Sequence, residues 1–178
     1  YALRNLRWIH AFFVVPALFT LLLDTYNAAD VTNRTQSPGG FPWTTIVSPD
    51  EFETLSWIRR EIDPEAVVQW DVKARQPGEW ALIPALGERR MAVGFPIFLL
   101  ELKKYRVRER RSLRPIFVSG DPVQAHLLAR QLGIDYIIIG PQELHVRGER
   151  VRPLFEAKDR FRRVFERGEV IVLEVLAP

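Results

Sequence analysis

The stretch Ile134–Ile139, IDYIII, decides the fold of this sequence, because Tyr136–Ile139 is an unbroken run of aromatic and β-branched residues. A short apolar run bounded by turn residues favours a strand that is buried on both faces. Gly133 ends the segment before it, and Gly140-Pro141 ends the strand itself. We therefore expect this strand at the centre of a sheet, paired in parallel and covered by helices.

The residues before this strand predict a helix over Pro122–Leu132. Asp121 is a suitable N-cap, proline is favoured at the first helical position, and Gly133 is a typical helix stop. Apolar residues recur there at helical spacing and are expected to form the buried face: Val123, Leu127, Leu128 and Leu132.

The residues after the strand predict a hairpin at the C-terminal end. Phe161–Glu166 and Val170–Val175 are rich in aromatic and β-branched residues, and Arg167-Gly168 separates them as a turn.

A second well-marked helix is predicted to begin after Ser48. Ser48 is the N-cap, Pro49 takes the first helical position, and Glu51 completes a capping box. Asp63-Pro64 ends the helix. The apolar stripe expected to face the core consists of Phe52, Leu55, Ile58 and Ile62.

Shorter elements are expected between these. The sequence predicts a strand over Ala66–Trp70, a helix over Trp80–Leu86, a second strand over Met91–Val93 and a mostly helical segment from Ile97 to Arg114. Arg114–Ser119 suits either a buried strand or the end of that helix.

The alternation of strands and helices followed by a hairpin predicts a three-layer-like α/β domain with a mixed sheet over residues 48–178. Residues 30–47, which contain Ser37-Pro38-Gly39-Gly40 and Pro42, are predicted to be a linker. Residues 1–29 are predicted to hold a transmembrane helix, the last span of a longer chain.

That helix is predicted from the stretch Trp8–Leu23, WIHAFFVVPALFTLLL, which carries no formal charge. As a helix it is roughly 24 Å long, against a hydrocarbon thickness of ~30 Å. Trp8 and Tyr26 stand at its ends, where amphipathic rings favour the membrane interface. The stretch therefore predicts contact with a lipid bilayer through residues 8–23. A buried helix of a soluble protein and a signal peptide are the alternatives.

The flanks of this stretch predict its orientation. Arg4 and Arg7 precede it, and basic residues mark the cytoplasmic side of a span. The sequence begins at Tyr1 and its single Met is Met91, so we expect Tyr1 to be an internal position of a multi-pass protein. The domain after the span is then expected to be extracytoplasmic, at a bacterial cell membrane.

The composition argues against several classes of site. Lys and Arg number 25 against 22 Asp and Glu, a net charge of +3, which does not favour nucleic-acid binding. Cys is absent and the three His are far apart in sequence, so no metal site is expected. No glycine-rich phosphate loop is present, and no cofactor is expected. The block Lys103–Arg111, with six basic residues and one Glu, is typical of a solvated helix face, with an anion or lipid-headgroup patch as the alternative.

Candidate ligand-binding residues follow the predicted strands. In an open α/β sheet, ligands bind beyond the carboxyl ends of the strands. Carboxylates, guanidinium groups and an indole, which bind sugars and phosphates, occur there: Asp71, Arg75, Trp80, Arg89 and Arg90. The structural alternative is that Asp71 pairs with Arg90 and that Trp80 belongs to the core. No catalytic residue is assigned.

Four segments, in this order, carry a resemblance to a known family: TLSWIRREIDPEAVVQWD, WALIPALGERRMAVGFP, LLARQLGIDYIIIGP and FRRVFERGEVIVLEV. They resemble the C-terminal soluble domain of large multi-spanning bacterial membrane proteins related to glycosyltransferases of the GT-C fold, including dolichyl-phosphate-mannose-type and YfhO-like proteins. The likeness runs from Glu53 onward. In GT-C enzymes the catalytic carboxylate generally lies in the first extracytoplasmic loop, so the resemblance assigns no catalytic residue here.

The resemblance implies a non-catalytic domain that caps the membrane part of a glycosyltransferase-like protein and contacts a polysaccharide acceptor or a lipid-linked sugar. The alternative is a single-span, membrane-anchored α/β module that itself binds a small anionic or sugar ligand. A soluble enzyme with a buried first helix is the third hypothesis.

Overall fold

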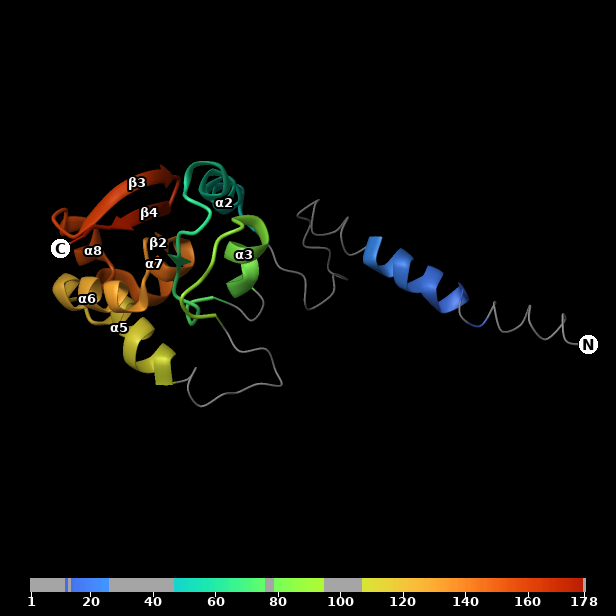
Figure 1. The fold of residues 1–178 in the computed structure, drawn as a ribbon, viewed down its shortest axis with the longest axis horizontal. Helices are drawn as coiled ribbons and strands as arrows, with labels where there is room; N and C mark the ends of the chain where they lie inside the picture. Colours follow the sequence, from blue (N-terminus) through green and yellow to red (C-terminus); the bar gives the residue numbers. More distant parts are fainter. Residues whose placement is uncertain (1–11, 13, 26–46, 76–78, 95–106, 178) are drawn as a thin grey trace, which may run out of the picture. The chain divides into compact units, whose positions relative to one another are not determined.

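The structure is a computed structural model that describes residues 12, 14–25, 47–75, 79–94 and 107–177. The chain divides into two compact units, Tyr1–Val47 and Ser48–Pro178. In the first unit, residues 14–25 are helical and are drawn in blue in Figure 1. Most of the predicted linker and the first residues of the predicted span lie outside the described residues.

The second unit is built on a four-stranded mixed sheet in the order β1-β2-β4-β3. Its strands are β1 (Val68–Gln69), β2 (Tyr136–Ile139), β3 (Phe161–Arg167) and β4 (Val170–Val175). β2 pairs in parallel with β1 and antiparallel with β4, and its three isoleucines are buried. The predicted buried central strand, the mixed sheet and the C-terminal hairpin are confirmed.

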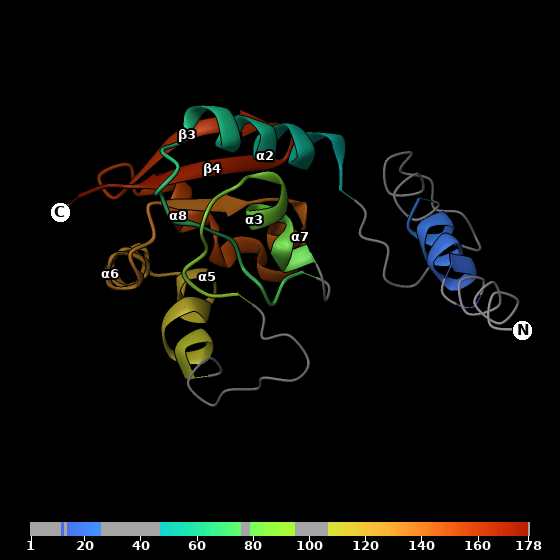
Figure 2. The same cartoon turned by 45° about the vertical axis from the view of Figure 1, so that its right-hand side comes forward.

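Helices cover the sheet. They are α2 (Pro49–Glu61), α3 (Leu82–Leu86), α5 (Arg114–Val118), α6 (Pro122–Leu132), α7 (Pro141–Arg147) and α8 (Arg152–Glu156). Figures 1 and 2 show α2 on one face of the sheet and α5 and α6 on the other. α2 packs on the hairpin, where the Trp57 ring stacks on Phe165 with centroids 4.6 Å apart. Two of these helices, α7 and α8, were not predicted from the sequence.

α2 begins as the sequence predicts. Ser48 Oγ accepts a hydrogen bond from the Glu51 N–H at 3.2 Å, and the Glu51 carboxylate accepts one from the Ser48 N–H at 3.4 Å. Leu55 and Ile58 are buried in the core. Phe52, predicted to share their buried stripe, is 44% exposed. That part of the prediction is wrong, because Glu51 is turned inward and takes the buried side of the first turn.

α6 ends at Gly133 (φ +68°) as predicted, but it buries a different face. Ala125 and Ala129 are fully buried, whereas Val123 and Leu127 are 55% and 56% exposed. Alanine side chains are small, so a neighbouring element can approach α6 closely at these two positions, which are one helical turn apart. The two alanines therefore form the buried face of α6. Leu128 and Leu132 are half-buried, so the predicted apolar face is wrong at Val123 and Leu127 only.

The predicted strand Met91–Val93 does not form, because the Gln69 side chain takes the place of its backbone ladder. Gln69 Nε2 donates to the Val93 carbonyl at 3.0 Å, and the Val93 N–H donates to Gln69 Oε1 at 3.0 Å. A side-chain amide offers the same donor and acceptor as a peptide group, so both backbone groups are satisfied. Backbone pairing is limited to an isolated bridge between Val67 and Arg90.

Residues 107–118 form one continuous helix, and its last part is α5. A π-helical turn, η2 (Glu109–Leu113), lies within it, and the Arg114 N–H donates to the Glu109 carbonyl five residues back. Pro115, which has no N–H, follows this wide turn directly. Of the two alternatives for Arg114–Ser119, the helical one is therefore observed. The earlier part of the predicted helical segment, residues 97–106, lies outside the described residues.

The second unit is expected to fold without the first, because every buried apolar side chain that the structure describes lies between Leu55 and Val175. A fragment of residues 48–178 should unfold in urea in one cooperative transition, with the same midpoint by far-UV circular dichroism and by tryptophan fluorescence. Non-coincident or non-cooperative transitions would instead favour the hypothesis in which the first helix belongs to the core.

Candidate functional site

The carboxyl ends of β1 and β2 meet at a buried group of charges, Glu51, Arg75 and Glu143, which we call the carboxyl-end cluster. The Arg75 side chain is fully buried. Its Nε and Nη2 donate to the two carboxylate oxygens of Glu143 at 2.8 and 3.0 Å, and its Nη1 donates to Glu51 Oε1 at 2.9 Å. Two parallel hydrogen bonds to one carboxylate form the strong, bidentate geometry of an arginine ion pair.

Both glutamates of the cluster stand in the first turn of a helix. Glu51 accepts the Ser48 N–H before α2, and Glu143 accepts the Gly140 N–H before α7, at 3.0 Å. Each carboxylate therefore lies at a helix N-terminus, where the helix dipole stabilises a negative charge. One arginine thus joins the starts of two helices.

Arg75 also stacks on Trp70, with its guanidinium carbon 3.6 Å from the ring centroid. Burial alone would lower the pKa of the Arg75 guanidinium, but Glu143 and Glu51 raise this pKa above its ordinary value. Burial raises the pKa of the Glu143 carboxyl, and Arg75 and the Gly140 N–H oppose this only in part. The cluster is therefore an interior network in which each charge depends on its partners.

Asp71, another predicted ligand-binding residue, is also paired internally. Its Oδ2 accepts from Arg147 Nε at 2.6 Å, and its Oδ1 accepts the Lys73 N–H at 2.9 Å. Asp71 is buried. The structural alternative that paired Asp71 with Arg90 is wrong, because Arg90 lies at the surface, 3.0 Å from Glu65.

Arg89 closes the C-terminal end of α2. Its Nη2 donates to the Arg59 carbonyl at 2.9 Å and to the Ile62 carbonyl, and its Nη1 donates to the Glu88 carbonyl at 3.0 Å. A cation at the last carbonyls of a helix complements the helix dipole. Trp80 lies in the 3-10 turn η1 (Glu79–Ala81). The structure describes its backbone but not its side chain.

The structure distributes the predicted ligand-binding residues over different places. Arg75 belongs to the carboxyl-end cluster, Asp71 pairs beside it, Arg89 caps α2, and Arg90 is exposed. The sequence did not lead us to predict Glu51, Glu143 and Arg147 as the partners of Arg75 and Asp71. The available signal was a repeated pattern, since SPDE at 48–51 and GPQE at 140–143 both place Pro and then Glu in a first helical turn. The assignment of these residues to a ligand stays a prediction.

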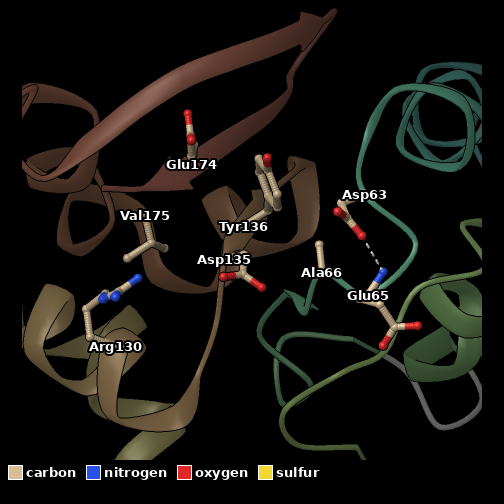
Figure 3. A pocket seen from close by; sticks show the side chains of 8 residues that line it. All are labelled: Asp63, Glu65, Ala66, Arg130, Asp135, Tyr136, Glu174 and Val175. Atoms are coloured by element: carbon tan, nitrogen blue, oxygen red, sulfur yellow. Dashed lines mark hydrogen bonds between the residues drawn. The ribbon is translucent and has the colours of Figure 1, made fainter. Parts of the chain in front are cut away.

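A hollow opens at the opposite, amino end of the parallel strands (Figure 3). Its volume is about 440 Å³, and it is lined by Asp63, Glu65, Ala66, Arg130, Asp135, Tyr136, Glu174 and Val175. Burial, followed by the negative charges of Glu174 and Asp135, raises the pKa of the Tyr136 phenol.

Two of the carboxylates in this hollow fix the local backbone. Asp135 Oδ2 accepts the Val67 N–H at 2.8 Å, and Asp63 Oδ1 accepts the Glu65 N–H at 2.7 Å, the bond dashed in Figure 3. In the described part of the chain, no group of His, Cys, Asp and Glu is placed to hold a metal ion.

A second hollow, of about 490 Å³, shares Arg130 with the first. It is lined by Val123, His126, Leu127, Arg130, Asp159, Arg160 and Ala177. His126 Nε2 lies 2.8 Å from the Leu176 carbonyl, and its ring meets the Phe161 ring edge-on at 5.7 Å. His126 thus contacts both Phe161 at the start of β3 and Leu176 just after β4.

The helix over 14–25 presents an apolar surface. All of its residues are exposed. The large apolar side chains of this helix are between 37% and 68% exposed: Val14, Val15, Leu18, Phe19, Leu21, Leu22 and Leu23. Phe12, before it, is 73% exposed. Thr20 Oγ1 donates to the Pro16 carbonyl at 3.0 Å, and Thr25 Oγ1 donates to the Leu21 carbonyl at 2.8 Å. None of the helices among the described residues has the length and apolar character that crossing a membrane requires.

No protein-family model matches the sequence, and no curated protein matches it. A solved structure, the crystal structure of the C-terminal globular domain of an oligosaccharyltransferase from Archaeoglobus fulgidus, is similar with a TM-score of 0.48 and 12% sequence identity. The match covers 74% of this chain and 100% of that chain. It carries no site residue over to this chain.

Replacing Arg75 is expected to destabilise the domain strongly. Arg75→Met leaves two carboxylates buried without their cation, which should lower the free energy of unfolding of residues 48–178 by about 3–5 kcal/mol. Urea denaturation measures this. The matched control is Arg90→Met, whose partner is at the surface and whose effect should stay within about 0.5 kcal/mol. Equal effects of the two changes would contradict the role given to the cluster.

The raised pKa of Tyr136 predicts a stability change at alkaline pH. Above the ordinary phenol value of 10.0 the unfolded chain loses this proton before the folded one does, so this contribution to stability is lost as pH rises towards the folded pKa. Between about pH 9 and pH 11, the urea midpoint should therefore fall further for the wild-type fragment than for Tyr136→Phe. The same fall in both proteins would show that the phenol titrates alike in the two states.

Proposed function

We propose that this chain is a non-catalytic part of a membrane-bound, glycosyltransferase-like protein. In this proposal residues 8–23 are embedded in the bilayer, and residues 48–178 form an extracytoplasmic α/β domain that caps the membrane part. The observation that carries the proposal is the exposed apolar surface of the helix over 14–25.

Water is a poor environment for that surface. Soluble monomers rarely expose contiguous apolar patches larger than a few hundred Å², and transfer to hydrocarbon is favourable by about 25 cal/mol per Å². The polar side chains of the helix support the same environment, because the hydroxyls of Thr20 and Thr25 are bonded to carbonyls of their own helix. Internal hydrogen bonding of this kind is what a bilayer interior demands, and Pro16 is tolerated in membrane helices.

The interior of the second unit supports a non-catalytic role. Asp71, Glu51 and Glu143 are all buried and paired with arginines. A general acid or base must come within hydrogen-bond reach of its substrate, and these three carboxylates are committed to holding helices and loops. The glycosyltransferase part of the proposal is supported by the resemblance of the four sequence segments. A polysaccharide acceptor or a lipid-linked sugar is the partner that this resemblance implies.

Flotation with phosphatidylcholine vesicles tests the membrane contact. The full chain should float with the vesicles, and the double change Phe19→Arg with Leu22→Arg should lower the partition coefficient by at least about 100-fold, because each arginine costs about 3 kcal/mol within a bilayer.

The matched control places the same charges on two exposed apolar residues of the other unit. Val123→Arg with Leu127→Arg should leave partitioning within about two-fold of wild type, since these positions are not proposed to enter hydrocarbon. A wild-type chain that stays in the aqueous fraction, or a Phe19/Leu22 variant that floats as well as wild type, overturns the proposal.

A further inference from the structure

Four arginines lie exposed on the helix over 107–118: Arg108, Arg110, Arg111 and Arg114. We call this group the arginine face. The helix, yellow in Figures 1 and 2, runs through the π turn η2 into α5. The proposed membrane attachment through residues 8–23 gives the arginine face no role by itself.

The arginines of this helix are exposed because the helix packs through other residues. Glu109, Leu113, Ile116 and Phe117 are buried and recur at helical spacing, so they define the inner side. The four arginines are exposed, together with Val107, which is 39% exposed. The exposed surface of this helix is therefore rich in positive charge.

Within the described residues this charge is not compensated by an ion pair. Among the described residues, none of the four arginines has a carboxylate within ion-pair distance, whereas exposed Arg59 and Arg152 lie 3.1 and 2.9 Å from carboxylates of Glu88 and Glu149.

The described elements that pack on η2 do not supply an acid either. α5 and α6 pack on η2 and contain no Asp or Glu. The one acid in the helix, Glu109, is 8% exposed, and its Oε1 has no hydrogen-bond partner. Its carboxylate is thus directed to the inner side and does not cover the arginine face.

We propose that the arginine face docks the domain on a bilayer surface that contains anionic phospholipids. This inference rests on the proposed function, because an embedded helix holds the domain close to that surface. Guanidinium groups meet phosphate oxygens in bidentate fashion, and each basic residue near an anionic leaflet strengthens binding by about five-fold. Residues 26–47 can extend over at most roughly 75 Å, so the domain stays near the bilayer in which the helix is embedded. Its effective concentration at the lipid surface is therefore high, and even a weak attraction is sufficient for docking.

A lipid surface fits this face better than a nucleic acid. Single-stranded nucleic acids are bound by basic grooves with aromatic side chains on which bases stack. The exposed side of the helix over 107–118 carries arginines and Val107, without an aromatic residue. The phosphate headgroups of a lipid surface supply the oxygens that guanidinium groups bind in bidentate fashion.

Energy transfer from single fluorophores to labelled headgroups tests the docking. The chain has no Cys, so Ser119→Cys, next to α5, and Ser56→Cys, on α2, each give one defined label. The full chain is reconstituted in vesicles of phosphatidylcholine alone or with about 30% phosphatidylglycerol. We expect phosphatidylglycerol to raise transfer from position 119 by about two-fold or more, and from position 56 much less. The rise should disappear in about 0.5 M NaCl, where the Debye length is only about 4 Å.

Variants identify the charges responsible. Changing the four residues of the arginine face to Gln should abolish the rise, and changing them to Lys should retain most of it. The matched control removes four exposed, ion-paired arginines, by Arg→Gln changes at Arg59, Arg90, Arg152 and Arg162, and should retain the rise. Near-UV circular dichroism checks that each variant is folded.

The outcomes separate the two proposals. Equal transfer in both vesicle types, an unaffected Gln variant of the face, or an equal loss in the control overturns the docking. Failure of the wild-type chain to associate with pure phosphatidylcholine overturns the membrane-embedded helix instead. In that case the arginine face is judged by flotation of the same variants with phosphatidylglycerol vesicles, where a loss confined to the face variant supports the docking and any other result overturns it.

Discussion

The domain depends on one constraint: a charge removed from water must be surrounded by partners. Arg75 meets this constraint by binding Glu51, 24 positions earlier in the chain, and Glu143, 68 positions later. The three residues come from the start of α2, the loop after β1 and the start of α7. The ion pairs therefore fix where two helices begin relative to the parallel strands. Gly140 allows this approach, since a Cβ there would lie only 3.4 Å from Arg75 Nη2.

The same network explains why the two ends of the parallel strands differ. The carboxyl end, where open α/β sheets commonly bind ligands, is filled here by the cluster, by Trp70 and by the pair of Asp71 with Arg147. The amino end keeps a polar hollow. Charge that other α/β domains direct at a substrate is used in this domain to hold its elements together.

Local signals in the sequence were sufficient for part of the fold. The ends of α2, the apolar run of β2 and the hairpin of β3 and β4 are each encoded within a few neighbouring residues, and all three were predicted. The buried face of α6 was not, because alanines pack closely where larger residues were expected. The predicted strand at Met91–Val93 does not form, because the Gln69 side chain makes the hydrogen bonds that a neighbouring strand would make. The strand propensity of the segment does not reveal such a side-chain partner. Arg75 was predicted as a ligand-binding residue, but its partners lie too far along the chain for spacing to indicate them.

The segment from Arg90 to Val93 also determines how the sheet can meet other chains. β1 is an edge strand of the sheet. The segment from Arg90 to Val93 covers this edge, because the Arg90 carbonyl accepts the Val68 N–H and the Val93 backbone bonds to the Gln69 side chain. On the far rim, β3 has a register irregularity between Arg163 and Phe165 and carries exposed charges at Arg162, Arg163, Glu166 and Arg167. Both rims thus resist intermolecular strand addition, the route by which exposed sheets polymerise. These features lower the tendency of the domain to pair through its sheet edges where many copies lie close together.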